Sequence, residues 1–529
     1  MKSRTSSSKA VILKKDLTRF APVWVEYSVI LAIIAWILHE EGSYYFESDG
    51  TVMFFSIINL FYGFVCAMSV FGYLHDSVEC NMVHAFPIRR ETWFGIHVTA
   101  GFLMGLVPNT VFCLVLLPLA LDEVIYLFLG IMLQFIFCYG LSIFCMVLTG
   151  RKFAALTLYG LFNFLAPLVQ WAVTTLYLPR LPGIWIDEEI FYWFYPMYQF
   201  MVSHGPMEEC ILIFFAYALM GLVLSAIALL LYRKRKLEYA GDFLAVKPLT
   251  SVFLAAVSFA SGCILAAISQ ELFGEQPTPM LVTGLLIGYF TGLMLLHKTV
   301  KVFQPKRIVG AVSIVAVVLG SLWVVELDLP NRVRFIPKPE DVKKVSIGLH
   351  YSKWADSYET NDPEVIQDIL GLHQEILEQG EVKEGDYGYN SCFLTYEMDS
   401  GTELMRWYTV TDIDAYEHLQ YYYSQPEYLL NVSTFEEFQE KLVKGEVYIH
   451  GSSSEVYREL EGEELEKMME LFWNDCVSGN MSPAHSTSAY PQVDVTWHLN
   501  EQDYFKHYSI PHTSKTYEYC TELWDKYRK

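Results

Sequence analysis

Histidine, cysteine, serine and carboxylate side chains are the groups of this 529-residue chain that could do chemistry if their spacing brought them together. Zinc sites place such side chains at short, regular spacings. The histidines of the C-terminal part lack this spacing; they are His485, His498, His507 and His512. The sequence also shows no Ser-His-Asp or Cys-His arrangement typical of a nucleophilic centre. We therefore expect no catalytic centre, no metal site and no enzymatic activity of the chain's own.

A phosphate-binding loop of the form G-x-x-x-x-G-K-[ST] does not occur in the sequence. In such a loop, backbone N–H groups and a lysine hold the phosphates of a nucleotide. We therefore expect that this chain binds neither ATP nor another cofactor.

Five amide side chains lie inside long apolar stretches: Asn59, Asn109, Gln134, Asn163 and Gln170. Such groups can line a substrate path, or they can form hydrogen bonds between neighbouring helices in apolar surroundings. We favour the second interpretation, because polar side chains within helix bundles more often serve as contacts between helices.

The elements that carry these residues are nine apolar stretches in the first 326 residues. Crossing the hydrocarbon core of a membrane takes about 20 predominantly apolar residues. The stretches lie at residues 22–38, 52–74, 94–120, 124–148, 153–177, 210–232, 249–269, 280–296 and 308–325. The predicted fold class is therefore a polytopic α-helical membrane protein with about nine transmembrane helices.

Charge is distributed unequally along the chain. Residues 1–326 contain 20 Lys+Arg and 21 Asp+Glu, whereas residues 327–529 contain 17 and 38. In the first part, the basic residues lie in the N-terminal segment and in the loops after the second, fourth, sixth and eighth stretches. The one exception is Arg180, which follows the fifth stretch. Cytoplasmic loops retain Lys and Arg. This pattern predicts a cytoplasmic N-terminus and, after nine crossings, an acidic extracytoplasmic region; so acidic a region does not favour a nucleic-acid partner.

An amphipathic segment precedes the first stretch. Residues 9–20 place Leu13, Leu17 and Phe20 on one helical face among lysines and Arg19. Such a helix suits the headgroup region of membrane lipid. The same pattern fits a plain basic flank equally well.

A second amphipathic segment lies between the second and third stretches, within residues 71–95. Val78, Met82 and Phe86 share a helical face there, and Pro87 should end the helix. A helix of this kind can dock in a groove of another protein or lie on lipid, and the periodicity alone does not separate the two.

Two motifs give the chain a resemblance to a known family. The first is Gly72-Tyr73-Leu74-His75 with His84-Ala85-Phe86-Pro87-Ile88-Arg89-Arg90, and the second is Tyr232-Arg233-Lys234-Arg235-Lys236-Leu237-Glu238-Tyr239-Ala240-Gly241. In their order and spacing relative to the apolar stretches, they resemble the type-2 ABC exporter permeases. More narrowly, the chain resembles the Gram-positive permeases that carry a large extracytoplasmic C-terminal domain. The resemblance covers residues 1–245.

The resemblance implies an elbow helix at residues 9–20 and a coupling helix at residues 75–86 that seats in a separate cytoplasmic ATPase subunit. The docking residues implied are His75, Asp76, Val78, Glu79, Met82, His84, Phe86, Arg89 and Arg90. It also implies short helices within residues 183–205. A second permease, in a homodimer or a heterodimer, and membrane lipid are the other implied partners.

The chain divides into three predicted regions, of which the first matches the family pattern and the second departs from it. Residues 1–245 form a six-span core, and residues 246–326 add three transmembrane helices that carry the chain to the outer side. Residues 327–529 alternate short strands with amphipathic helices, which indicates an α+β domain.

The α+β domain shows similarity to itself at an offset of about 100 residues. Val365, Ile369 and Leu372 align with Leu465, Met469 and Phe472, and Arg406-Trp407-Tyr408 aligns with Lys506-His507-Tyr508. We favour an internal duplication over chance similarity. The predicted lobes are residues 341–425 and 444–527, each ordered strand, helix, strand, strand, helix.

The function expected from these features is that of an exporter permease in a bacterial plasma membrane, energised by ATP bound to the separate ATPase subunit. The substrate stays open among peptides, lipids and antibiotic-like compounds. The alternative is an ATPase-driven mechanotransmitter or envelope-stress sensor that acts through the outer domain without transport.

Overall fold

The computed structural model describes most of the chain. The described residues are 2–41, 49–118, 121–181, 183–184, 186, 189–201, 207–246, 248–274, 277–328, 332–349, 357–378, 391–409, 421–422, 424–430, 432, 434–450, 455–481, 492–499 and 505–527.

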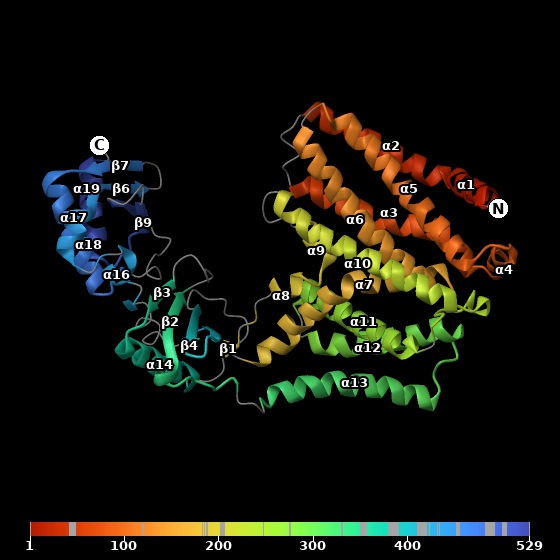
Figure 1. Ribbon diagram of the computed structural model, residues 1–529. Helices are drawn as coiled ribbons and strands as arrows, with labels where there is room; N and C mark the ends of the chain where they lie inside the picture. Colours follow the sequence, from red (N-terminus) through yellow and green to blue (C-terminus); the bar gives the residue numbers. More distant parts are fainter. Residues whose placement is uncertain are drawn as a thin grey trace. The chain divides into compact units, whose positions relative to one another are not determined.

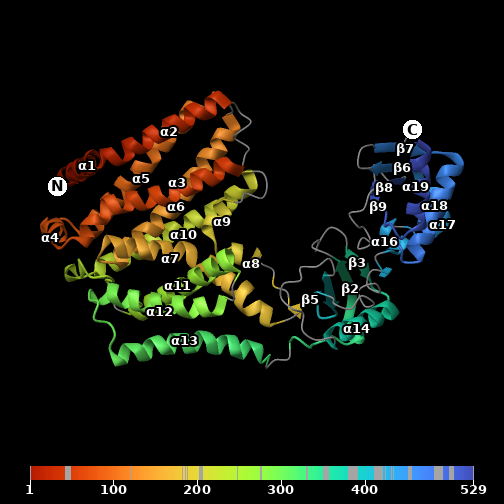
Figure 2. The ribbon, with the colours of Figure 1, turned by 180° about the vertical axis from the view of Figure 1, so that it is seen from behind.

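The chain divides into two compact units. The first comprises Met1–Leu176 with Asp187–Leu322, and the second comprises Tyr177–Ile186 with Trp323–Lys529. Long helices build the first unit, and two antiparallel sheets with their covering helices build the second (Figures 1 and 2). The three additional helices therefore group with the first six, and a short segment between the fifth and sixth groups with the C-terminal part.

Nine helices within the described residues are long and apolar enough to cross a membrane, as the sequence predicts. They are α2 (Ala21–Glu41), α3 (Asp49–Phe71), α5 (Arg90–Leu116), α6 (Leu121–Leu148), α7 (Lys152–Ala172), α10 (Met207–Lys234), α11 (Leu249–Phe273), α12 (Pro277–His297) and α13 (Pro305–Glu326). Among them, α6 is the most deeply buried and α13 the least.

Shorter helices connect these long ones. The amphipathic helix α1 (Lys2–Arg19) ends in a turn at Phe20, and α2 then begins with Pro22 in its first turn, where proline is tolerated. The helix α4 (Ser77–Ala85) lies between α3 and α5. Two short helices, α8 (Glu189–Tyr192) and α9 (Pro196–Met201), lie between α7 and α10, within the segment where such helices are implied.

Glycines allow close approach of the helices of the first unit. A Cβ atom on Gly140 of α6 would lie 2.2 Å from the carbonyl oxygen of Gly221 on α10. On α12, a Cβ on Gly288 would lie 2.6 Å from the Cβ of Ser261 on α11. Small residues at such crossings are a common means of packing helices within membranes, because lipid supplies little hydrophobic drive for association.

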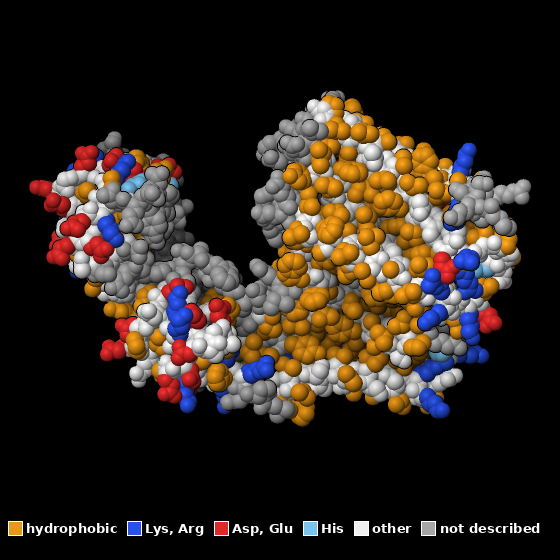
Figure 3. Space-filling view, viewed as in Figure 1, with side chains coloured by type: hydrophobic (Ala, Val, Ile, Leu, Met, Phe, Trp, Pro, Cys, Tyr) orange, Lys and Arg blue, Asp and Glu red, His pale blue; other side chains and the backbone are white. Residues whose placement is uncertain are grey.

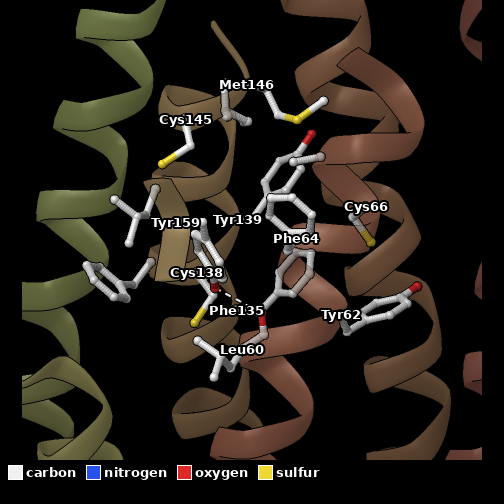
Figure 4. Close-up of a cluster of buried hydrophobic side chains, with 14 of the residues drawn as sticks. Leu60, Tyr62, Phe64, Cys66, Phe135, Cys138, Tyr139, Cys145, Met146 and Tyr159 are labelled. Carbon is white, nitrogen blue, oxygen red and sulfur yellow. Dashed lines mark hydrogen bonds between the residues drawn. The ribbon is translucent and has the colours of Figure 1, made fainter. Parts of the chain in front are cut away.

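Aromatic and sulfur-containing side chains fill the space between α3, α6 and α7. Figure 4 shows this cluster, in which the Tyr159 hydroxyl donates a hydrogen bond of 2.9 Å to the Leu60 carbonyl oxygen. The labelled members are Leu60, Tyr62, Phe64, Cys66, Phe135, Cys138, Tyr139, Cys145, Met146 and Tyr159. This part of the helical unit is therefore a packed core.

The first sheet of the second unit has the strand order β1-β5-β4-β2-β3. Its strands are β1 (Gly183–Ile184), β2 (Val342–Leu349), β3 (Ser357–Thr360), β4 (Ser391–Met398) and β5 (Glu403–Thr409), and α14 (Pro363–Glu378) packs against it. Val345, Ile347 and Leu394 point into its core with Ile369 of α14.

The second sheet has the order β7-β6-β8-β9. Its strands are β6 (Leu442–His450), β7 (Glu455–Leu460), β8 (Gln492–Leu499) and β9 (Phe505–Ser509). Four helices accompany it: α16 (Pro426–Leu429), α17 (Phe435–Lys441), α18 (Gly462–Val477) and α19 (Lys515–Tyr527). Trp497 and Phe472 are fully buried in its core.

The two sheets share a topology once β1 is set aside. In both, the first strand pairs with the second and the third, and the third pairs with the fourth. The registers also agree: Ser346 lies opposite Thr395 and Glu359, and Glu446 lies opposite Thr496 and Glu459. An irregularity interrupts β2 between Val342 and Lys344, and another interrupts β6 between Leu442 and Lys444.

The structure corrects two details of the predicted lobes. Each lobe has a further strand, β3 or β7, before its helix. The sequence did not reveal these strands because they lie at sheet edges and carry polar or exposed residues. In addition, Arg406 lies opposite Leu394 and Tyr508 lies opposite Val495, so β5 and β9 correspond at an offset of 102 residues instead of 100. The predicted final helix of the first lobe falls largely outside the described residues.

Candidate functional site

The helix α4 is delimited by local interactions at both ends. The Asp76 carboxylate accepts hydrogen bonds from the backbone N–H groups of Val78 at 2.8 Å and Glu79 at 3.0 Å, which is N-capping. At the other end Phe86 adopts an extended backbone before Pro87, which cannot continue a helix. The predicted helical segment at residues 75–86 therefore contains a nine-residue helix, Ser77–Ala85.

One face of α4 is held against the end of α10 by a chain of hydrogen bonds. The hydroxyls of Tyr73 and Tyr232 are 2.9 Å apart, and the Tyr232 hydroxyl lies 3.1 Å from Nε2 of His84. Nδ1 of His84 lies 2.7 Å from the Cys80 carbonyl oxygen. Partial burial lowers the pKa of His84, which favours the neutral ring in this network.

Arg235, which follows α10, joins the segment after α3 to the last turn of α6. Its side chain is 8% exposed and donates hydrogen bonds to the carbonyl oxygens of Leu74 at 2.9 Å, Met146 at 3.2 Å and Val147 at 2.6 Å. Met146 and Val147 lie in the last turn of α6, where carbonyl groups need donors and a cation is favourable. Burial lowers the pKa of Arg235 to about 10, so the guanidinium stays charged at neutral pH.

On the opposite side of α4, three exposed apolar side chains form what we call the apolar ridge: Val78 and Met82 of the helix and Phe86, which follows it. Val78 is 76% exposed, Met82 56% and Phe86 52%. The ridge lies at the end of the helical unit where Lys and Arg side chains gather in Figure 3. Exposed apolar groups in polar surroundings are typical of a surface that contacts a protein or a lipid.

The neighbouring helix α1 contacts this region through an ion pair and a buried carboxylate–imidazole contact. Arg19 lies 3.3 Å from the carboxylate of Glu79 on α4, with both side chains exposed. Asp16 lies 3.0 Å from Nδ1 of His97 on α5, and both of these side chains are largely buried. The surface pair contributes little stability. The buried pair positions α1 along α5.

The nine predicted docking residues separate into two groups. Val78, Met82, Phe86 and Arg89 present exposed side chains, with Asp76 and Glu79 at the start of α4 beside them. By contrast, His75, His84 and Arg90 are directed to other parts of the chain. Nε2 of His75 lies 3.2 Å from the Thr149 hydroxyl, and Arg90 donates to the carbonyl oxygens of Arg233 at 3.2 Å and Arg235 at 2.8 Å. These three residues hold the surface in place, and the others form it.

The amide side chains of the long helices mostly serve as contacts between elements. Asn59 donates to Gln134 at 3.2 Å, Asn109 accepts from the Tyr27 hydroxyl at 2.9 Å, and Gln170 accepts from Tyr195. Asn163 instead donates to a carbonyl oxygen of its own helix. The interpretation that these groups form hydrogen bonds between neighbouring helices is therefore confirmed for Asn59, Gln134 and Asn109, whereas the partner of Gln170 lies between α8 and α9.

Within the described part of the chain, no three His, Cys, Asp or Glu side chains are arranged to hold a metal ion. His498 lies 3.4 Å from Glu446, and His485 falls outside the described residues. Burial raises the pKa of the Cys392 thiol to about 12, so it is unreactive at neutral pH.

Sequence reasoning missed the strand β1, which comes from the segment between α7 and α10. Gly183 lies opposite Trp407 and Ile184 opposite Arg406, so β1 forms the edge of the first sheet beside β5. Gly183 has a φ of +76°, and a Cβ there would lie 2.1 Å from the Tyr408 ring. Gly183 was the available sequence signal for β1, because a strand of two residues is too short to show an alternation of apolar and polar side chains.

Comparisons with known proteins leave these features to be interpreted on physical grounds. No family model, no curated protein and no solved structure matches the chain.

Proposed function

We propose that the chain is the permease subunit of an ATP-binding-cassette exporter, energised by a separate ATPase subunit that docks on the apolar ridge of α4. The observation that carries this proposal is the division of α4 into a ridge of exposed apolar side chains and an inner face bonded to α10. A helix that only lies on lipid needs no such attachment. A helix that receives force from a partner protein needs such an attachment to pass the force to the rest of the chain.

The charge distribution supports a cytoplasmic place for this ridge. Lys and Arg gather over the end of the helical unit that carries α4 (Figure 3), as expected for the cytoplasmic side. If all nine helices cross the membrane, the segment after α7 and the chain beyond α13 emerge together on the other side. The pairing of β1 with β5 agrees with this, because it unites those two parts in one sheet.

Force on α4 has a defined route into the helical unit. Tyr232 and His84 connect α4 to α10, and Arg235 connects the end of α10 to Leu74 and to the last turn of α6. Since α6 is the most buried of the long helices, a tilt of α4 on ATP-driven closure of the partner would reach the centre of the unit. ATP itself is bound by the partner subunit.

We place the transport path between two permeases, as a homodimer or a heterodimer. The space between α3, α6 and α7 is filled by the cluster in Figure 4, which leaves little room for a path there. The substrate class stays open among peptides, lipids and antibiotic-like compounds, and the membrane is the plasma membrane of a bacterium.

The docking proposal is tested with paired aspartate substitutions on exposed apolar residues. The variant V78D/M82D should lower co-purification of the chain with a co-expressed ATP-binding-cassette subunit by at least about tenfold, since a charge at a buried contact is costly. The matched control is V300D/F303D, because Val300 and Phe303 are also exposed and lie between α12 and α13. The control should co-purify normally, and both variants should insert in the membrane. Unchanged co-purification of V78D/M82D would contradict the proposal.

A second candidate function is mechanical signalling, in which the ATPase moves the outer domain to act on an envelope partner and nothing is transported. The specific observation is β1, because it joins the segment after α7 to the sheet of the second unit. Substrate flux in reconstituted vesicles would exclude signalling as the sole function. ATP-dependent change in the second unit without flux would favour it.

We also propose that the two lobes of the outer domain arose by duplication. The support is the shared strand order, the matching registers and the irregularity at equivalent places in β2 and β6. The repeated irregularity supports duplication more strongly than the shared strand order does, because four-stranded antiparallel sheets are common.

A further inference from the structure

A cavity lined by basic side chains lies where α5 begins and α10 ends. Its volume is about 690 Å³, and its lining residues are Arg89, Arg90, Glu91, Thr92 and Arg233. It lies beside the segment that contains Phe86 but belongs to different helices from the apolar ridge.

The charges of the cavity favour an anion. The lining has three guanidinium groups and one carboxylate, that of Glu91, which lies 3.0 Å from Nε of Arg233. Arg90 is fixed by hydrogen bonds to the carbonyl oxygens of Arg233 and Arg235, which sets the position of its charge. Arg89 is exposed at the N-cap of α5. Guanidinium groups in such a cluster match the oxygen atoms of a phosphate group.

An exposed apolar stripe on α10 leads to the cavity. Leu219, Leu222 and Leu230 are all more than half exposed, and the exposed Ala226 lies midway between the last two. Arg233 follows Leu230 by three residues on the same face. The rise from Leu222 to Arg233 is about 16 Å along a helix. That length is close to half of the roughly 30 Å hydrocarbon core, which is the depth of one leaflet.

We infer that this cavity binds the phosphate headgroup of an anionic phospholipid from the cytoplasmic leaflet, with the acyl chains along the stripe of α10. A free phosphate ion would use the guanidinium groups but gain nothing from the stripe. Basic pockets beside transmembrane helices on the cytoplasmic side suit anionic headgroups. This site requires that the helices cross a membrane, and it does not depend on the ATPase.

The test measures lipid binding to the full chain in zwitterionic detergent. Native mass spectrometry counts retained phosphatidylglycerol, and titration with short-chain phosphatidylglycerol, short-chain phosphatidylcholine and inorganic phosphate distinguishes the sources. Phosphatidylglycerol should bind, and the other two should bind at least about tenfold more weakly. Equal competition by inorganic phosphate, or equal binding of phosphatidylcholine, would overturn the assignment.

Two variants locate the site. R89Q/R233Q should weaken phosphatidylglycerol binding by about thirtyfold, since each basic group near an anionic lipid contributes about a factor of five. The control K301Q/K306Q removes the same charge from exposed residues between α12 and α13 and at the start of α13, and should bind as the unmodified chain does.

The single variant R89Q should fold normally, because Arg89 is exposed. It should weaken phosphatidylglycerol binding about fivefold. Equal lipid retention in R89Q, R233Q and the control would overturn the inference. Co-purification with the ATPase is measured on R233Q, because Arg89 belongs to the proposed docking surface and Arg233 does not. Normal co-purification of R233Q is expected whether or not lipid binds, so failure here is distinguishable from failure of the docking proposal.

Discussion

Arg235, which follows α10, donates a hydrogen bond of 2.9 Å to the carbonyl oxygen of Leu74, which precedes α4. The same guanidinium also reaches the last turn of α6. One buried charge therefore connects three segments of the chain beside the proposed docking surface.

Replacing this residue should loosen that junction. In R235Q, the shorter amide cannot reach three carbonyl groups, so we expect a loss of about 2–3 kcal/mol in stability from unmade hydrogen bonds. Thermal unfolding of the full chain in detergent measures this loss. The matched control is R151Q, because Arg151 is exposed and donates to the carbonyl oxygen of Gly241 at 2.7 Å. Equal midpoints for R235Q and R151Q would contradict the role given to Arg235.

A substitution at Gly183 should detach β1 from the first sheet. G183A places a Cβ against the Tyr408 ring and forces a left-handed backbone on a residue that disfavours it, which alone costs about 1–2 kcal/mol. Hydrogen exchange of the peptide containing β5 should then become faster. The control G371A lies on α14, where an added Cβ meets nothing within 4 Å, and should leave that exchange unchanged or slower. Unaltered exchange in G183A would show that β1 does not protect β5.

The first lobe should lose stability in acid because of His373. This ring is fully buried and lies 2.8 Å from the Tyr408 hydroxyl and 3.0 Å from that of Tyr396. Burial, with a smaller contribution from Arg406, lowers the pKa of His373 to about 3. An unfolded histidine has a pKa of about 6.5. Between these values the unfolded chain binds a proton that the folded chain does not, so stability falls as the pH drops from 6.5 towards 3.

Hydrogen exchange of β4 as a function of pH checks this prediction, after correction for intrinsic exchange. Protection should decline by up to about 1.4 kcal/mol per pH unit in the unmodified chain. H373Q removes the titrating group and should flatten the decline. H450Q, a change in the second lobe, should not affect it. A slope in H373Q equal to that of the unmodified chain would assign the acid sensitivity to other groups.

The long helices and α4 were predictable because local sequence specifies them. Length and apolar composition define a span such as α6, and Asp76 and Pro87 delimit α4 by capping and by the absence of an N–H group. The exposed positions of Val78, Met82 and Phe86 followed from helical periodicity.

The remaining features depend on contacts between distant segments. Nothing near Arg235 in the sequence indicates that its side chain turns inward to three carbonyl groups, because a basic residue after a span is usually solvated. The strand β1 has two residues and needs β5 to exist. Equivalent positions are 100 residues apart in β2 and β6, 101 apart in β4 and β8, and 102 apart in β5 and β9, so an alignment at one fixed offset cannot match all the strands.

Site-specific photocrosslinking tests the docking of an ATPase on α4 most directly. A benzophenone amino acid at Met82, in the full chain reconstituted with its proposed ATP-binding-cassette subunit, should yield a covalent adduct with that subunit on illumination. The same group at Val300, which is 74% exposed, should yield none. Adduct formation at Met82 alone is the predicted result. No adduct at Met82, or equal adducts at both positions, would contradict the account.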